Sequence, residues 1–185
     1  MEEKTFVSRG GIKLQAALDQ FKIDTKNKVV LDVGSSTGGF VDCLLQNGAL
    51  KVYAVDTCYG ELAWKLRNNP RVVVMERTNI LHLESLSEEV DLITIDAGWT
   101  KLELILPVVK KFLKPEGIII ALLKPHYEAE KQYKGGVVPE DFVEKIKNNV
   151  IKNINDLGFK IYEEMESPIL GGAGNKEYLV LIKMG

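Results

Sequence analysis

The chain has 185 residues, of which 45% are hydrophobic and 27% are charged, and its formal net charge is −2. This length and composition predict one globular domain over residues 1–185, and the small net charge excludes attraction of nucleic acid by the chain as a whole. The sequence contains neither a signal peptide nor an apolar segment of about 20 residues, so we expect a cytoplasmic protein without a membrane partner.

Apolar residues at helical spacing alternate with short continuous apolar runs along the chain. Thr100 and Glu103 form a capping-box pattern ahead of one helix, and Pro139 and Gly158 are the start and stop signals of the longest helix. In chain order the patterns predict a helix at 14–21, a strand at 28–33, a helix at 40–47, a strand at 51–56, a helix at 61–69, strands at 71–76 and 90–96, a helix at 100–112, a strand at 117–124, a helix at 139–157, and strands at 159–166 and 176–184.

The order of these elements predicts the fold class. Five continuous apolar strands in succession, with helical patterns between them, favour a parallel sheet that is covered on both faces. The last two strands are joined by SPILGGAGN, which is too short for a helical crossover, so they should be antiparallel. We therefore predict an α/β, Rossmann-like fold with a seven-stranded, mostly parallel sheet, an antiparallel last strand and helices on both faces.

The loop after the first strand, in LDVGSSTGGF, lies where open α/β sheets bind nucleotide-like ligands. Ser36 replaces the middle glycine that a dinucleotide fingerprint requires, and Asp32 suits a cationic amino group better than a diphosphate. Asp56, at the end of the second strand, can accept ribose hydroxyls, and Asn79 can bind an adenine edge. A packing turn and a nicotinamide site are the alternatives, but the pattern favours S-adenosylmethionine. The predicted cofactor residues are Asp32, Gly34, Ser35, Ser36, Gly38, Gly39, Phe40, Asp56, Thr57, Asn79 and Asp96.

Cys43 and Cys58 are fifteen residues apart and have no metal-ligand spacing with His82 or His126. We expect no metal site and two buried, reduced thiols.

Four polar residues stand at the ends of predicted elements. Lys13 follows a glycine pair, Asp96 and Lys124 end the fourth and fifth strands, and Glu177 begins the last strand. The ends of the parallel strands and the start of an antiparallel last strand share one edge of the sheet, so these side chains should meet beside the cofactor.

The motifs FVSRGGIKL, LDVGSSTGGF, VMERTN, KGGVV and GNKEYL resemble the hemolysin-A-type (TlyA) family of ribosomal RNA methyltransferases. More distantly the chain is similar to FtsJ-type 2′-O-methyltransferases, which share an S-R-x-x-x-K-L opening. The resemblance implies a class I, S-adenosylmethionine-dependent methyltransferase with a catalytic tetrad, which falls on Lys13, Asp96, Lys124 and Glu177. It also implies ribosomal RNA or a ribosomal subunit as the partner.

Two features depart from the family pattern. Family members usually carry an N-terminal S4-type RNA-binding domain, and this chain starts at the methyltransferase domain, so such a domain would act in trans. The segment after Asp96 is AGWT, where the family more often has a serine-phenylalanine pair.

The tetrad suits removal of a proton from a ribose hydroxyl. A lysine acts as a base only when desolvation or a neighbouring cation favours its neutral form. We expect Lys124 to be the base and Lys13 to be that cation, with Asp96 and Glu177 holding both ammonium groups. The Gly10-Gly11 pair is expected to form a loop over the methionine end of the cofactor.

Candidate RNA contacts are Lys4, Arg9, Lys22, Lys131 and Lys134, together with a loop over the site, EAEKQYKGGVVPED. A solvated charged face is the alternative for these residues. The competing functions are a catalytically idle RNA-binding or assembly module, a hemolysin-like protein, and a methyltransferase for proteins or small molecules.

Overall fold

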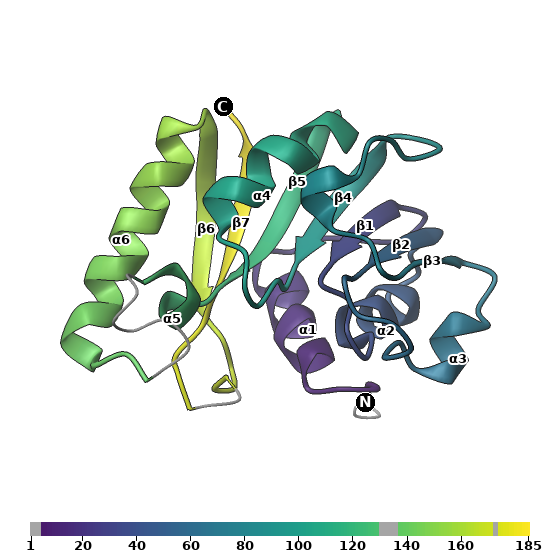
Figure 1. The fold of residues 1–185 in the computed structure, drawn as a ribbon, viewed down its shortest axis with the longest axis horizontal. Coiled ribbons are helices and arrows are strands. Elements are labelled where there is room, and N and C mark those ends of the chain that lie inside the picture. Colours follow the sequence, from purple (N-terminus) through teal and green to yellow (C-terminus); the bar gives the residue numbers. More distant parts are fainter. Residues whose placement is uncertain (1–4, 130–136, 172–173) are drawn as a thin grey trace.

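The computed structural model describes residues 5–129, 137–171 and 174–185. Seven strands form one sheet in the order β3-β2-β1-β4-β5-β7-β6 (Figure 1). The strands are β1 (Val29–Val33), β2 (Lys51–Val55), β3 (Val72–Met75), β4 (Val90–Ile95), β5 (Leu113–Leu123), β6 (Phe159–Glu166) and β7 (Tyr178–Met184). The helices are α1 (Gly10–Gln20), α2 (Gly39–Gln46), α3 (Trp64–Arg67), α4 (Leu102–Val109), α5 (Pro125–Glu128) and α6 (Glu140–Asp156), with 3₁₀ turns η1 (Ile80–His82) and η2 (Lys110–Phe112).

The predicted sheet is confirmed. Strands β1 to β5 pair in parallel, and β7 inserts between β5 and β6 and is antiparallel to both. Every residue of β1 is buried, because helices cover both faces of the sheet at this central position. The carboxyl ends of β1, β2, β4 and β5 therefore open at one edge, where β7 begins.

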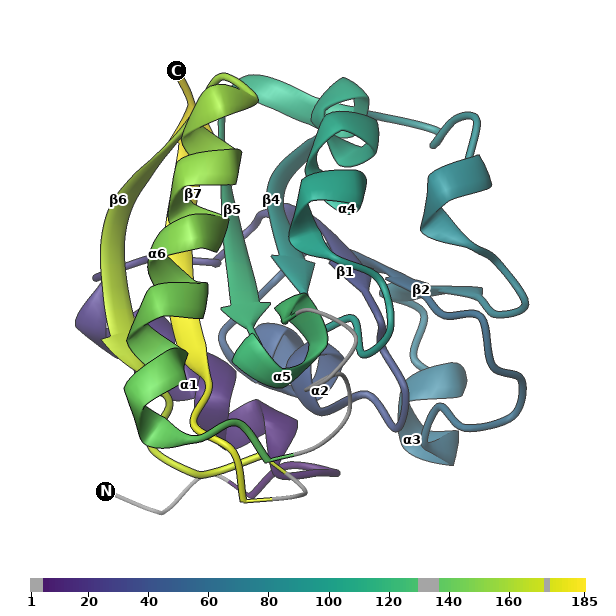
Figure 2. The same ribbon diagram turned by 60° about the vertical axis from the view of Figure 1, so that its left-hand side comes forward.

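Two hydrophobic clusters, one on each face of the sheet, lie between the strands and the helices that cover them. One joins the sheet to α4 and α6, and the other joins the opposite face to α1, α2 and α3. Figure 2 shows α4 and α6 on one side of the strands. In the part of the chain that the structure describes, no helix is both long enough and apolar enough to cross a membrane.

The glycine pair lies inside a helix and not in a loop as predicted, because Gly10 and Gly11 are the first two residues of α1. A Cβ atom at Gly11 would lie 2.3 Å from Cγ of Phe6, and one at Gly39 would lie 2.9 Å from the Gly11 nitrogen. The glycines thus let α1 and α2 begin side by side, and this close packing offsets their low helix propensity.

Two predicted helix starts are also wrong. The helix predicted at 61–69 covers only Trp64–Arg67, because the Glu76 carboxylate accepts hydrogen bonds from the Gly60 and Leu62 amides and holds the preceding chain in a loop. The capping box does not form either. Helix α4 begins at Leu102, whose amide donates to Oε1 of Glu128, 2.9 Å away.

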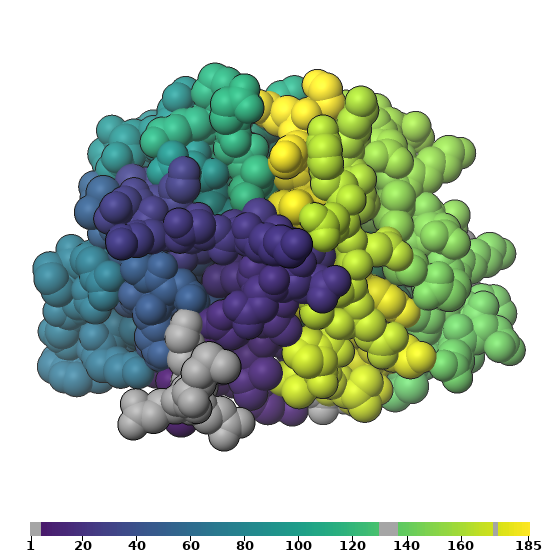
Figure 3. Space-filling view, turned by 180° about the vertical axis from the view of Figure 1, so that it is seen from behind, coloured from purple at the N-terminus to yellow at the C-terminus, as the bar shows by residue number. Residues whose placement is uncertain are grey.

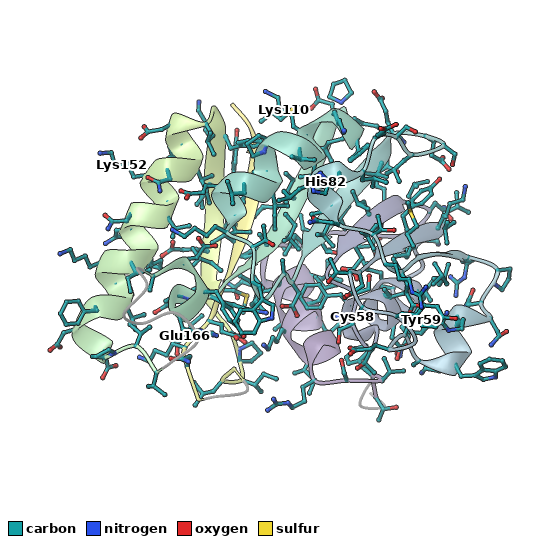
Figure 4. All side chains as sticks on the ribbon, viewed as in Figure 1. Cys58, Tyr59, His82, Lys110, Lys152 and Glu166 are labelled. Atoms are coloured by element: carbon teal, nitrogen blue, oxygen red, sulfur yellow. The ribbon has the colours of Figure 1, made fainter. Side chains whose placement is uncertain are left out.

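The longest helix ends as its stop signal predicts, since Gly158 follows α6 with a φ of +83°. Leu157 is 40% exposed, so it is not part of the buried face of that helix. Cys43 is buried as expected, but Cys58 is exposed on the loop that follows β2, next to Tyr59 (Figure 4). The prediction of two buried thiols is therefore wrong for Cys58.

Candidate functional site

Two adjoining cavities open at the carboxyl edge of the sheet. The larger has a volume of about 380 Å³ and the smaller about 230 Å³. Gly34, Ser36 and Asp96 line both, so the cavities meet at the loop after β1. Gly34 has a φ of +84°, and a Cβ atom there would lie 2.6 Å from the carbonyl oxygen of Asp96. Only glycine lets the loops after β1 and β4 approach this closely.

The larger cavity is lined by the loops after β1, β2, β3 and β4 and by the end of β5. Its lining residues are Val33, Gly34, Ser36, Val55, Asp56, Thr57, Cys58, Glu61, Thr78, Asn79, Ile80, Asp96, Ala97, Gly98, Trp99, Thr100, Ile105 and Lys124. Three carboxylates and one ammonium group stand in this wall, so the cavity is acidic and favours a cationic ligand.

The smaller cavity has the opposite balance. It is lined by Ser8, Arg9, Gly10, Lys13, Gly34, Ser35, Ser36, Thr37, Gly39, Phe40 and Asp96. Arg9 and Lys13 face a single carboxylate there, and α1 and α2 begin at its wall. Glu177, behind the wall, balances the charge of Lys13. The positive ends of the two helix dipoles add to the charge of Arg9, so this cavity favours an anionic group.

Asp56 holds the loops that shape the larger cavity. Its Oδ2 accepts a hydrogen bond from the Ser36 amide at 2.7 Å, and its Oδ1 accepts one from the Cys58 amide at 2.8 Å. Ser36 has a positive φ of +45°, and its hydroxyl donates to Oε2 of Glu61 at 3.2 Å. The Asp56 carboxylate therefore ties the loop after β1 to the loop after β2.

Asp32 lies behind the cleft and not in its wall. Its side chain is fully buried, Oδ1 accepts a hydrogen bond from the Thr94 hydroxyl at 2.6 Å, and Oδ2 has no partner among the described residues. Burial raises the pKa of Asp32 to about 7, against the lowering effect of the Thr94 and Ser35 hydroxyls. The charges of Asp96 and Asp56 raise the pKa of Asp32 further.

The four predicted tetrad residues form two ion pairs. Nζ of Lys124 lies 2.5 Å from Oδ1 of Asp96, and the ammonium group of Lys13 contacts Oε2 of Glu177. The second pair joins segments 164 residues apart, and Figure 3 shows the N-terminal part of the chain, in purple, against the C-terminal part, in yellow. A Cβ atom at Gly171 would lie 2.4 Å from Oε1 of Glu177, so a glycine leaves room for this carboxylate.

The tetrad residues divide between the two cavities. Asp96 lines both, Lys124 lines the larger and Lys13 lines the smaller, whereas Glu177 is buried behind Lys13 and lines neither. His126, which the sequence did not single out, is close to both pairs. Burial lowers the pKa of His126, Glu177 raises it, and Lys124 and Lys13 lower it.

An aromatic contact borders the larger cavity beside Lys124. The rings of Trp99 and Tyr127 have their centroids 5.2 Å apart, and Nζ of Lys124 lies 5.6 Å from the centroid of the Tyr127 ring. Trp99 is 74% exposed and lines the cavity. In the sequence Trp99 is only a departure from the family pattern. A tryptophan shortly after a strand end is the signal that indicates this position.

The other predicted residues have varied positions. Thr57 and Asn79 line the larger cavity, although Oδ1 of Asn79 already accepts a hydrogen bond from the Leu81 amide. Ser35, Gly39 and Phe40 line the smaller cavity. Gly38 lines neither, and its φ of +99° serves the turn into α2. The described residues contain no cluster of histidine, cysteine, aspartate or glutamate side chains that could hold a metal ion.

The candidate RNA contacts are only partly placed. Arg9 lines the smaller cavity, but Lys22 lies beyond the opposite end of α1, an 11-residue helix about 16 Å long, and so does not flank the site. Lys4, Lys131 and Lys134 lie outside the described residues, as do residues 130–136 of the loop that the sequence places over the site.

Comparisons with known proteins show the family of the chain. The family model described as "FtsJ-like methyltransferase" matches residues 6–184. The chain is 44% identical over 184 residues to the Bacillus subtilis protein named "Putative rRNA methyltransferase YqxC", covering 95% of this chain and 64% of that protein. It is 39% identical to the "16S/23S rRNA (cytidine-2'-O)-methyltransferase TlyA" of Mycobacterium tuberculosis, covering 98% of this chain and 69% of that protein. A solved structure titled "Putative hemolysin from Streptococcus thermophilus" has a TM-score of 0.93 and 40% identity, and the match covers 100% of this chain and 69% of that one.

Proposed function

The chain belongs to the FtsJ-like methyltransferase family, and from this membership and the two cavities we propose that it transfers a methyl group from S-adenosylmethionine to a ribose 2′-hydroxyl of ribosomal RNA. The observation that carries the proposal is the meeting of an acidic and a basic cavity at Asp96, with one lysine of the tetrad in each. The curated relatives extend beyond the match, so the substrate is proposed from their names and from the chemistry of this site.

The charges of the two cavities fit S-adenosylmethionine better than a dinucleotide. A sulfonium and an ammonium group suit a wall with Asp56, Glu61 and Asp96, whereas a diphosphate would be repelled there. Asp32 adds a carboxyl group behind that wall, and one of its buried oxygens has no hydrogen-bond partner in the part of the chain that the structure describes. The methionine carboxylate would then lie in the smaller cavity, where Arg9 supplies the opposite charge.

Residues of the larger cavity would hold the adenosine part. Each oxygen of the Asp56 carboxylate accepts one amide hydrogen bond and retains a lone pair for a ribose hydroxyl. Asn79 keeps its amide NH₂ group for an adenine edge, since its Oδ1 is taken by the turn at η1. When bound, S-adenosylmethionine supplies an already activated methyl group, so the protein must orient the acceptor and accept one proton.

Lys124 is the base in this mechanism. Its amine would take the proton of the 2′-hydroxyl, and Asp96 fixes the position of its Nζ from 2.5 Å away. Lys13 is held by Glu177 in the adjoining cavity, where its charge can anchor the ribose-phosphate next to the reacting hydroxyl. The acidic wall and Arg9 thus face the cofactor, and Lys13 faces the RNA side.

The RNA itself would be bound through a local basic surface, because the net charge of the chain is −2. A separate RNA-binding domain acting in trans would increase this affinity without a change in the site.

Transfer of a labelled methyl group to ribosomal RNA, followed by mapping of the modified ribose, tests the proposal. Lys124→Ala should lower turnover by about 10²- to 10⁴-fold, the usual contribution of a general base, while the cofactor still binds. Lys152→Ala, an exposed lysine on α6 far from the cleft (Figure 4), is the matched control and should leave turnover unchanged. Retention of more than about a tenth of the turnover by Lys124→Ala would contradict its role as the base.

Calorimetry tests the cofactor separately. S-adenosylmethionine should bind and NAD should not, because the wall of the larger cavity carries three carboxylates. Arg9→Ala should weaken binding of S-adenosylhomocysteine but not of 5′-methylthioadenosine, which lacks the carboxylate. Binding of NAD without a response to S-adenosylmethionine would overturn the assignment.

A further inference from the structure

Glu128 connects two segments of the site without lining either cavity beside the sheet edge. It is the last residue of α5, the single turn that follows Lys124, and its own amide donates to the Lys124 carbonyl at 3.2 Å. Its Oε1 accepts a hydrogen bond from the Leu102 amide at 2.9 Å, at the first residue of α4. One carboxylate therefore bridges the end of the segment after β4 and the end of the segment after β5.

The two bridged segments contact each other at three points. They meet first at the ion pair of Asp96 and Lys124, next at the tilted rings of Trp99 and Tyr127, and last at the Leu102 amide and Glu128. The parallel pairing of β4 and β5 fixes only the beginning of the two segments. The hydrogen bond between the Leu102 amide and Glu128 joins their far ends, so the segments are held together at both ends.

This position is unfavourable for a carboxylate. Burial raises the pKa of Glu128 to about 7, the Leu102 amide and Lys101 lower it, and Glu103 raises it. Among the described residues the charged groups lining the same cavity, between α4, α5 and α6, are Lys101, Glu103 and Lys145. A neutral residue at this position would avoid the cost of burying a charge. A long side chain with an acceptor oxygen is needed, however, to accept the hydrogen bond from the Leu102 amide at the start of α4.

The geometry points to Glu128 as a positioning residue: its bond to the Leu102 amide holds the Asp96 segment against the Lys124 segment and so fixes the geometry of that ion pair. This inference rests on the proposed function, in which Asp96 positions the base. Glu128 itself touches neither the cofactor nor the acceptor. Misplacement of reacting groups by about 1 Å can lower a rate about a hundredfold, so a remote contact of this kind has a measurable effect.

Methyl transfer to ribosomal RNA by the full chain tests the inference with Glu128→Ala and Glu128→Gln. The alanine variant should lose about 10- to 100-fold in kcat with little change in KM or in affinity for S-adenosylhomocysteine, whereas glutamine keeps an acceptor and should recover most of the rate. Glu128→Asp keeps the charge but lacks the reach to the Leu102 amide, so its kcat should fall nearly as far as that of the alanine variant. Glu103→Ala is the matched control, because Glu103 lines the same cavity and bonds Asn153 on α6. It should leave kcat unchanged.

Trp99 gives a readout that does not depend on activity. In a Trp64→Phe background Trp99 is the only tryptophan of the chain, and its contact with the Tyr127 ring restrains its motion. Glu128→Ala should lower the fluorescence anisotropy of Trp99, and Glu128→Gln should not. Wild-type kcat and wild-type anisotropy in Glu128→Ala would overturn the inference. If the alanine variant fails to fold, Glu128→Asp decides, and wild-type kcat in that variant overturns the inference. An inactive wild type would instead contradict the proposed function, and the anisotropy result would still test the role of Glu128.

Discussion

Replacement of Asp32 by asparagine should make the protein more stable at neutral pH and leave it almost unchanged at pH 4. Asp32 is fully buried, and burial raises its pKa from 3.8 to about 7. Between these two values the unfolded chain has lost the proton and the folded chain retains it. The free energy of unfolding therefore falls as pH rises through this window. Asparagine mimics the protonated acid, since its oxygen can still accept from Thr94, and it does not titrate.

The size of the effect follows from the difference between the two pKa values. Each unit corresponds to 1.36 kcal/mol, so the shift from 3.8 to about 7 amounts to about 4 kcal/mol. The stability of the wild type relative to Asp32→Asn should fall by about this amount between pH 4 and pH 8. Such a loss is a large part of the total stability of an ordinary domain, about 5–15 kcal/mol.

Urea unfolding of both proteins at several pH values between 4 and 8 measures this difference. Asp91→Asn gives a control that should not vary with pH over most of this range. Burial raises the pKa of Asp91, but hydrogen bonds from Lys114 and the Val29 amide outweigh it and leave that pKa below its ordinary value of 3.8. The stability that Asp91 contributes is present above its unfolded pKa and is lost only as pH falls through the folded pKa, so the cost of Asp91→Asn should be nearly constant above about pH 5. A constant difference between wild type and Asp32→Asn across the whole range would refute the reasoning for Asp32.

Four further expectations follow from the site. Asp56→Ala should weaken binding of S-adenosylmethionine by about 1.5–3 kcal/mol in calorimetry, as for hydrogen bonds to a charged group, and an unchanged dissociation constant would remove Asp56 from the site. Cofactor binding at pH 7 should release protons, because a cationic ligand near Asp32 favours the ionised form of this residue. The heat of binding should then vary with the ionisation enthalpy of the buffer, and a heat that does not depend on the buffer would contradict this. Gly11→Ala should destabilise the protein by about 1–3 kcal/mol in urea unfolding, since the added Cβ would lie 2.3 Å from Phe6, and an unchanged midpoint would show that Phe6 moves aside freely. RNA binding should weaken steeply as salt rises, with few phosphate contacts, and nanomolar affinity that ignores salt would point to a different RNA surface.

Much of the fold follows from the sequence alone. Mostly apolar runs in β1, β2, β4 and β5 predict buried parallel strands, because a sheet that is covered on both faces buries successive side chains of a strand. The short link between the last two strands predicts their antiparallel pairing for a similar reason, since it leaves no room for a crossover. These patterns lie within short stretches of the chain, so they can be recognised in the sequence without knowledge of the tertiary structure. The identities of the tetrad residues also came from the sequence, through motifs that resemble a known family.

The tertiary structure decided what the side chains at those element ends contact. Lys13 and Glu177 are 164 residues apart, and only the insertion of β7 beside β5 brings them together. The division of charge between the cavities likewise depends on which loops share a wall, and Glu128 meets Leu102 only because the segments after β4 and β5 run together. Asp32 was predicted in the cleft but lies behind it. Side chains on a strand alternate between the two faces of the sheet, and the packing of the helices on each face decides how far a side chain is buried. Local patterns determine strands and helices, whereas contacts between distant segments determine charge, burial and the geometry of the site.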